Sequence, residues 1–237
     1  MQYGRRMITD NYLNDENNLN IYRFGSYVYK SNNEFSDEDY IIVMREYYET
    51  KDINVHHYSV TQFQDLINRH DIQALECMFL DTKFILKQNY TFNFSLDKSK
   101  LRTSISTIAS NSWVKGKKKL IVTGDYKLNL AIKSIFHSLR ILDYGIQIAE
   151  HHKIINYASM NYVLDDLYKL SKTYQRNELW EIIDTKYRKL FNSKSSLFKE
   201  LCPKNLDEAN KKIIIEKLFI KYNINNQDLI NEILQIL

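Results

Sequence analysis

The chain has 237 residues, of which 44% are hydrophobic and 13% aromatic, so it can bury a core and is not of the disordered class. Its formal net charge of +4 fits a protein that binds phosphates, but does not by itself indicate a nucleic-acid partner. No apolar run approaches the roughly 18 residues of a membrane span, and no apolar stretch follows the first residues, so we expect no membrane association and no secretory signal. Cys77 and Cys202 are isolated and lack metal-type spacing, which favours a reduced, cytoplasmic location.

The first 97 residues carry the signals of a small mixed β-sheet. A short helix or a turn is predicted over residues 7–18, and strands are predicted over residues 19–24, 39–46, 52–58 and 82–87. Ser59 and Gln62 have the spacing of a capping box, which predicts a helix directly after the third strand. The apolar spacing within residues 71–80 predicts a second helix.

Helical patterns dominate after residue 97. The whole chain contains 5 Gly and 1 Pro, and so few helix-breaking residues favour long helices. Helices are predicted over residues 101–112, 129–151, 161–171, 173–192, 206–222 and 228–237. We therefore expect an α+β fold, with a mixed-sheet core over residues 1–97 and a helical bundle over residues 98–237.

A Gly-Ser pair is followed, eleven residues after the serine, by an Asp-x-Asp pair. Gly25 and Ser26 end the first predicted strand, and a glycine lets a phosphate approach the main chain closely. Asp37 and Asp39 lead into the next strand, where alternation puts both carboxylates on one face. Neighbouring carboxylates repel each other unless a cation lies between them, and Mg²⁺ accepts such ligands while keeping part of its shell for phosphates. The pattern predicts metal-assisted phosphoryl or nucleotidyl transfer; the alternative is a strand pair with a solvated acidic turn.

This pattern resembles the DNA polymerase β-like nucleotidyltransferase superfamily. Its signature is a strand, Gly-Ser, a short helix and then Asp-x-Asp or Asp-x-Glu on the next strand, matched here by Gly25, Ser26, Asp37 and Asp39. Family members commonly have Arg after the serine and Gly a few residues further on. This chain departs from both preferences, with Tyr at position 27 and Lys at position 30, which leaves the substrate less defined.

Two further segments resemble the uncharacterised "predicted nucleotidyltransferases" of bacteria and their phages. Residues 70–79 are similar to a D-I-x-A-L-E-x-L-F segment of that group, and residues 133–140 to its K-x-x-x-H-x-x-R helix. Lys133, His137 and Arg140 share one helix face, and the resemblance implies that they receive a triphosphate. The alternative for these three side chains is a solvated basic face.

The resemblance also implies a third acid on a neighbouring strand, where it helps to hold the metal and acts as a base. Asp52 is our candidate for this catalytic and metal-binding role, because it precedes the third predicted strand. Asn54 and His56 share its strand parity, and activity would be weakened or lost if Asn54 took the place instead. Glu76 is a second candidate, although it fits better as a support for its helix or for a neighbouring basic group.

The densest basic run is Lys115-Gly116-Lys117-Lys118-Lys119. It either contacts the phosphates of a nucleotide or polynucleotide, or forms a flexible solvated loop. The nearby Trp113 either stacks on a base or belongs to the core. The two His-His pairs lack zinc-site spacing, so a zinc site is not expected.

Together these patterns predict a Mg²⁺- or Mn²⁺-dependent nucleotidyltransferase. It would bind a nucleoside triphosphate and move its nucleoside monophosphate to a hydroxyl of RNA, protein or a small molecule, releasing pyrophosphate. One alternative is a catalytically silent nucleotide-binding or scaffold module of the same fold. Another is an antitoxin-like modifier that adds AMP to a separate partner.

Overall fold

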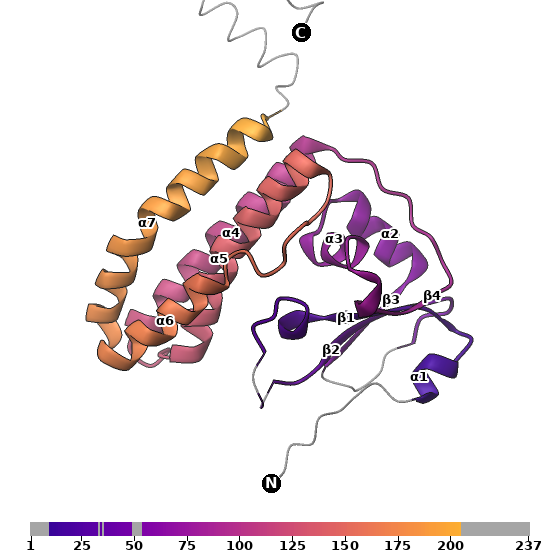
Figure 1. Ribbon diagram of the computed structural model, residues 1–237, viewed down its shortest axis with the longest axis horizontal. Coiled ribbons are helices and arrows are strands. Elements are labelled where there is room, and N and C mark those ends of the chain that lie inside the picture. Colours follow the sequence, from indigo (N-terminus) through magenta and orange to yellow (C-terminus); the bar gives the residue numbers. More distant parts are fainter. Residues whose placement is uncertain (1–9, 33, 35, 49–53, 205–237) are drawn as a thin grey trace, which may run out of the picture. The chain divides into compact units, whose positions relative to one another are not determined.

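A four-stranded mixed sheet precedes a set of long helices, as predicted (Figure 1). The computed structural model describes residues 10–32, 34, 36–48 and 54–204. Contacts divide the chain into residues 1–202 and residues 203–237, and the fold described below is that of the first unit. Its strands are β1 (Asn18–Phe24), β2 (Asp39–Met44), β3 (Val55–Ser59) and β4 (Ile85–Gln88). Its α-helices are α1 (Asp10–Asn14), α2 (Val60–Asn68), α3 (Ile72–Met78), α4 (Lys98–Ile121), α5 (Leu128–His151), α6 (Asn161–Thr173) and α7 (Arg176–Leu201).

The sheet has the strand order β3-β2-β1-β4. Strand β1 pairs antiparallel with β2 and β4, whereas β2 and β3 run parallel. Alternation along β2 divides its side chains between two layers. Ile41 and Val43 pack against α2 and α3 in the main core, while Tyr40 and Ile42 face the opposite side, where α1 packs.

The main core continues from the sheet into the helices. Leu101 and Ile105 of α4, Ile141 of α5 and Phe198 of α7 belong to the same buried cluster as Ile41. Helices α4, α5 and α7 pack side by side, as Figure 1 shows. A second cluster lies among α4, α5, α6 and α7 and includes Trp113, so the core prediction for this tryptophan is confirmed.

The predicted capping box is confirmed in detail, and two further helix caps are found. The Ser59 amide donates to Gln62 Oε1 and the Gln62 amide donates to Ser59 Oγ, which completes the capping box of α2. Asp71 caps α3 and Asp97 caps α4, each by accepting backbone N–H groups. The first helix of the helical part begins at Lys98, but the division into two domains at residue 97 stays a prediction.

The loop alternative for residues 115–119 is wrong, because α4 continues to Ile121. Gly116 is buried where α4 meets α5, and apolar neighbours on the same helix face hold the basic run in helical form. Helix α7 likewise extends beyond its predicted end to Leu201. The helices predicted over residues 206–222 and 228–237, and Asp52 before the third strand, lie outside the described residues. In the part of the chain that the structure describes, no helix is both long and apolar enough to cross a bilayer.

Close packing at Gly145 gives a first prediction. A Cβ at this position would lie 2.9 Å from Ile105 Cγ2 and 2.9 Å from Phe198 Cε2, so a Gly145→Val substitution overpacks the contact among α4, α5 and α7. We expect its free energy of unfolding to fall by roughly 1–3 kcal/mol in urea denaturation. The control Ser110→Val, at an exposed position of α4, should change stability by only a few tenths of a kcal/mol. Equal stability of the Gly145→Val variant and the wild-type protein would contradict this account of the helix contact.

Candidate active site

The turn after β1 brings Gly25 against Asp39. Gly25 has a φ of +76°, and the amides of Val28 and Tyr29 donate to its carbonyl oxygen at 3.0 and 3.2 Å. Phe24 pairs with Asp39 in the sheet, and a Cβ on Gly25 would collide with the Asp39 carboxylate. Glycine is therefore required both by the backbone angle and by the closeness of the carboxylate.

The residue between the two aspartates has a different role from its neighbours. Glu38 is buried and accepts hydrogen bonds from Arg23 Nη2, at 3.1 Å, and from the Tyr40 hydroxyl. Asp37 and Asp39 instead line one pocket, together with Ser26. The segment that enters β2 at Asp39 thus separates an anchoring carboxylate from two carboxylates that line the pocket.

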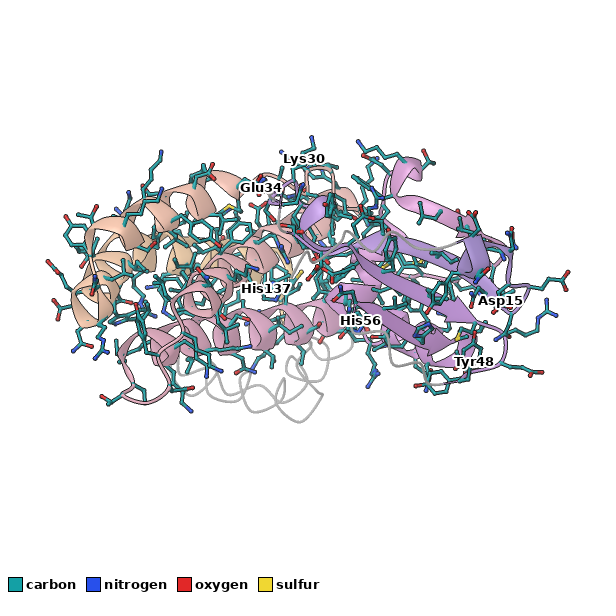
Figure 2. All side chains as sticks on the ribbon, turned by 90° about the horizontal axis from the view of Figure 1, so that it is seen from below. Asp15, Lys30, Glu34, Tyr48, His56 and His137 are labelled. Carbon is teal, nitrogen blue, oxygen red and sulfur yellow. The ribbon has the colours of Figure 1, made fainter. Side chains whose placement is uncertain are left out.

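The pocket has a volume of about 920 Å³ and lies between the sheet and the helices. Ser26, Asp37 and Asp39 line its sheet side. Its helical side is lined by all three predicted α5 residues, Lys133, His137 and Arg140, and by Lys115 of α4. Figure 2 shows His137 on the helical part and His56 near the end of the sheet that faces it. Residues separated by about a hundred positions in the sequence are thereby brought into one cavity.

Burial raises the pKa of the Asp39 carboxyl above its ordinary value. The positive charges of His56 and Lys133 lower this pKa, and the negative charge of Asp37 raises it. Lys133 therefore lies within electrostatic reach of the Asp39 carboxyl. The site therefore combines two carboxylates that repel each other with cations on the facing elements.

The neighbouring strand β3 supplies His56 rather than a described carboxylate. Strand β3 runs parallel to β2, with His56 beside Ile41, and the Tyr40 amide donates to the Asn54 carbonyl oxygen at 2.9 Å. Because paired residues share a face, His56 lies on the side of Asp39. Asp52, the predicted third acid, is outside the described residues. Within those that are described, no three His, Cys, Asp or Glu side chains form a cluster able to hold a metal ion.

The donor set around Asp37 and Asp39 fits a hard divalent cation. Both side chains offer carboxylate oxygens, and the cavity they line is wide enough to admit further oxygen ligands. Mg²⁺ commonly takes one or two carboxylates and completes its shell with water and substrate phosphates. Asp37 and Asp39 would therefore hold Mg²⁺ or Mn²⁺ only in part, and a bound phosphate would supply other ligands.

Arg140 is buried at the back of the pocket. Its guanidinium carbon lies 3.5 Å from the centre of the Tyr29 ring, and its Nη2 lies 3.9 Å from Glu76 Oε1. The Tyr29 hydroxyl donates to the other Glu76 oxygen at 2.5 Å. Glu76 thus supports a neighbouring basic group, as predicted, and the basic stripe of α5 is solvated only in part, since Lys133 is exposed whereas Arg140 is not.

The basic run of α4 has one member in the pocket. Lys115 lines the cavity, whereas Lys117 lies over the Trp180 ring and Lys119 pairs with Asp125. Gly116 follows Lys115 and packs so closely on α5 that a Cβ would collide with the Ile135 side chain. The close contact between α4 and α5 at Gly116 therefore fixes the distance between Lys115 and α5.

Some lining residues were missed by the sequence patterns. Asn129 and Phe136 of α5 and Leu164 and Tyr168 of α6 line the helical side of the pocket. Asn and Tyr are abundant in this chain, which has 18 tyrosines, so their types carried no signal. The spacing of Asn129, Lys133 and Phe136 along one helix face would have indicated them once the pocket side of α5 was known.

Comparisons of this chain with protein-family models, with curated proteins and with solved structures give no match. Function is therefore inferred from the pocket and the residues that line it.

The buried carboxyl of Glu76 gives a pH-dependent prediction. Burial raises its pKa from 4.5 to about 7, although Arg140 and the Tyr29 hydroxyl act in the opposite direction. The folded protein thus holds this proton more tightly than the unfolded chain, so the stabilisation is complete below about pH 4.5 and is lost as the pH rises through about 7. Relative to a Glu76→Gln variant, the wild-type free energy of unfolding should fall by on the order of 2–3 kcal/mol across that range.

Urea denaturation at several pH values checks this expectation. Glu181→Gln, at an exposed position of α7, is the matched control and should run parallel to the wild-type protein. A constant difference between the wild-type protein and the Glu76→Gln variant would contradict the raised pKa.

Proposed function

We propose that this protein is a Mg²⁺- or Mn²⁺-dependent nucleotidyltransferase. The observation that carries the proposal is the single pocket that contains Ser26, Asp37 and Asp39 on one side and Lys133 on the other. Paired carboxylates opposite lysines suit a ligand that is both metal-bound and strongly anionic. A nucleoside triphosphate is such a ligand, and drug-sized ligands occupy cavities of roughly 300–1,000 Å³.

The residues that line the pocket have different roles in the proposed transfer. Lys115 and Lys133 attract and orient the triphosphate, and Ser26 offers its hydroxyl to a phosphate oxygen. Asp37 and Asp39 hold the metal, which when bound supplies Lewis-acid stabilisation of the phosphates and a lowered pKa for the attacking hydroxyl. The acceptor hydroxyl gives its proton to water as its oxygen bonds to the α-phosphorus. The bond from the α-phosphorus to the bridging oxygen breaks, and pyrophosphate leaves with that oxygen and its electron pair.

The acceptor is proposed to be an RNA, a protein or a small molecule with a hydroxyl group, with preference for a macromolecule. Incubation with labelled ATP, GTP, CTP or UTP and a cell extract would identify it. Nuclease-sensitive label indicates RNA, protease-sensitive label indicates protein, including transfer of AMP to a separate partner, and low-mass label indicates a small molecule.

A catalytically silent nucleotide-binding module is the second candidate. It is favoured by the acidic cluster, which within the described part of the chain does not reach three metal-binding side chains. Mg²⁺-dependent binding of a nucleoside triphosphate without release of pyrophosphate, for every acceptor tested, would select this candidate over the transferase.

We also propose a cytoplasmic location. Cys77 and Cys202 are both free thiols in the folded chain, and both are buried. Such use of cysteine is typical of proteins in reducing compartments.

The acidic pair is tested by substitution. Asp37→Asn and Asp39→Asn should each lower nucleotidyl transfer on the order of 10³-fold or more, because each removes a metal-binding charge without changing side-chain size. Release of pyrophosphate measures the rate, and circular dichroism checks the fold. Asp81→Asn removes a charge from an exposed carboxylate that does not line the pocket, so its rate should match the wild-type rate. Undiminished transfer in both test variants would refute the proposal.

The cationic side is tested separately from the acidic pair. Lys133→Met should raise the KM for the nucleoside triphosphate by about tenfold or more, because it removes a charged contact to phosphate. Lys117→Met is the matched control, since it removes a lysine that lies over Trp180 outside the pocket. The two variants should be compared in steady-state kinetics at one ionic strength. Equal KM values for both would show that Lys133 does not bind the triphosphate.

A further inference from the structure

Arg140 and His137 form a contact that a triphosphate-binding role for both residues does not explain. Arg140 Nη2 lies 3.0 Å from Nδ1 of His137, one helical turn earlier on α5. A guanidinium has only N–H donors and stays protonated, so the imidazole nitrogen facing it must be the acceptor. The His137 ring is therefore neutral in this contact, and its proton resides on the other nitrogen, Nε2.

The surroundings of Arg140 hold the guanidinium in this position. Glu76 of α3 faces it at 3.9 Å, and the Tyr29 ring packs on its flat face. Arg140 is nine-tenths or more buried, at 6% exposure, which leaves it little freedom to turn toward a ligand. The contact to His137 is thus a fixed part of the pocket wall.

The Nε2–H group of His137 is available to a ligand in the pocket. His137 lines the cavity, and among the described residues none makes a hydrogen bond to its Nε2. The ring is only partly buried, so a ligand in the cavity can meet this N–H group. The charged and titratable groups around His137 are Arg140 and Lys133 on α5, Lys115 on α4, Tyr168 on α6, and Tyr29, Asp37 and Asp39 on the sheet side.

We propose that Arg140 is a positioning residue, which fixes His137 as a neutral imidazole whose Nε2–H donates a hydrogen bond to an oxygen of the bound ligand. The ligand part of this inference rests on the proposed function, under which that oxygen belongs to the nucleoside triphosphate. Arg140 itself makes no contact with the phosphates. Among the described residues that line the pocket, the positive charges that meet the triphosphate are then those of Lys115 and Lys133.

The electrostatics of the ring agree with this geometry. Burial, together with the positive charges of Arg140 and Lys115, lowers the pKa of His137 from 6.5 to about 3. The imidazole thus stays uncharged over the whole physiological range.

Nuclear magnetic resonance of the full chain with ¹⁵N-labelled histidine tests the positioning role without any need for activity. In the wild-type protein, His137 should show a protonated Nε2 and an unprotonated Nδ1, unchanged between about pH 5 and 8. A His137→Gln variant assigns the signal by its disappearance. The wild-type spectrum is enough to overturn the proposal: it would do so if it showed a proton on Nδ1, or a charged ring at about pH 6.

The role of Arg140 is tested in an Arg140→Met/Glu76→Gln double variant, which removes the buried charges together. The His137 ring should then populate both tautomers, and its pKa should rise. Arg102→Met is the matched control, because Arg102 donates to backbone carbonyls of α7 and its end rather than to the pocket. An unchanged His137 signal in the folded double variant would show that burial alone sets the tautomer, and would overturn the proposal.

The ligand contact is tested by titration with Mg²⁺·ATP and with Mg²⁺·tripolyphosphate. Either should shift the His137 Nε2 signal in the wild-type protein, and the double variant should bind it about tenfold more weakly. Binding without a shift at Nε2 would overturn the donor role while leaving the proposed function intact. Absence of binding, with the fixed tautomer present, would refute the proposed function and with it the ligand contact, but not the positioning by Arg140.

Discussion

The site depends on one buried cation, the guanidinium of Arg140. It joins three segments that are distant in sequence. Arg140 lies on α5, faces Glu76 of α3, and packs on Tyr29, which follows the turn at the end of β1. The Tyr29 amide is bonded to the carbonyl of Gly25, so the same cluster supports the turn that carries the Gly-Ser pair. A buried guanidinium that loses its partners is strongly destabilising, because its charge is left uncompensated. The sheet and the helices around the pocket are thus coupled through a contact that is costly to disrupt.

At the start of β2, adjacent carboxylates take different roles. Glu38 faces the side of Arg23 and Tyr40 and is bound by both, while Asp37 and Asp39 line the pocket. Because Glu38 is hydrogen-bonded between them, the main chain that carries Asp37 and Asp39 is held in place. Gly25 completes the arrangement by allowing the carboxylate of Asp39 to approach the turn.

Local signals in the sequence were enough to predict the fold class and part of the site. The capping box at Ser59 and the strand before Gly25 depend on neighbouring residues only, and both are as predicted. The position of His56 was not predictable in the same way, because it follows from the parallel pairing of β2 with β3. The burial of Arg140 also depends on distant residues, since a basic helix stripe is usually solvated unless another element covers it. The helical state of residues 115–119 was missed because it depends on the contact of Gly116 with α5.

Gly116 lies at a close helix contact directly beside the pocket. The residue contacts α5 on the side of Ile135, and the preceding residue, Lys115, lines the cavity. The absence of a side chain at position 116 therefore allows α4 and α5, which line the same side of the cavity, to pack closely together. The width of this side of the cavity thus depends on a contact between helices that lies apart from Asp37 and Asp39. One substitution at this contact would change the shape of the cavity while leaving the two carboxylates that line it in place.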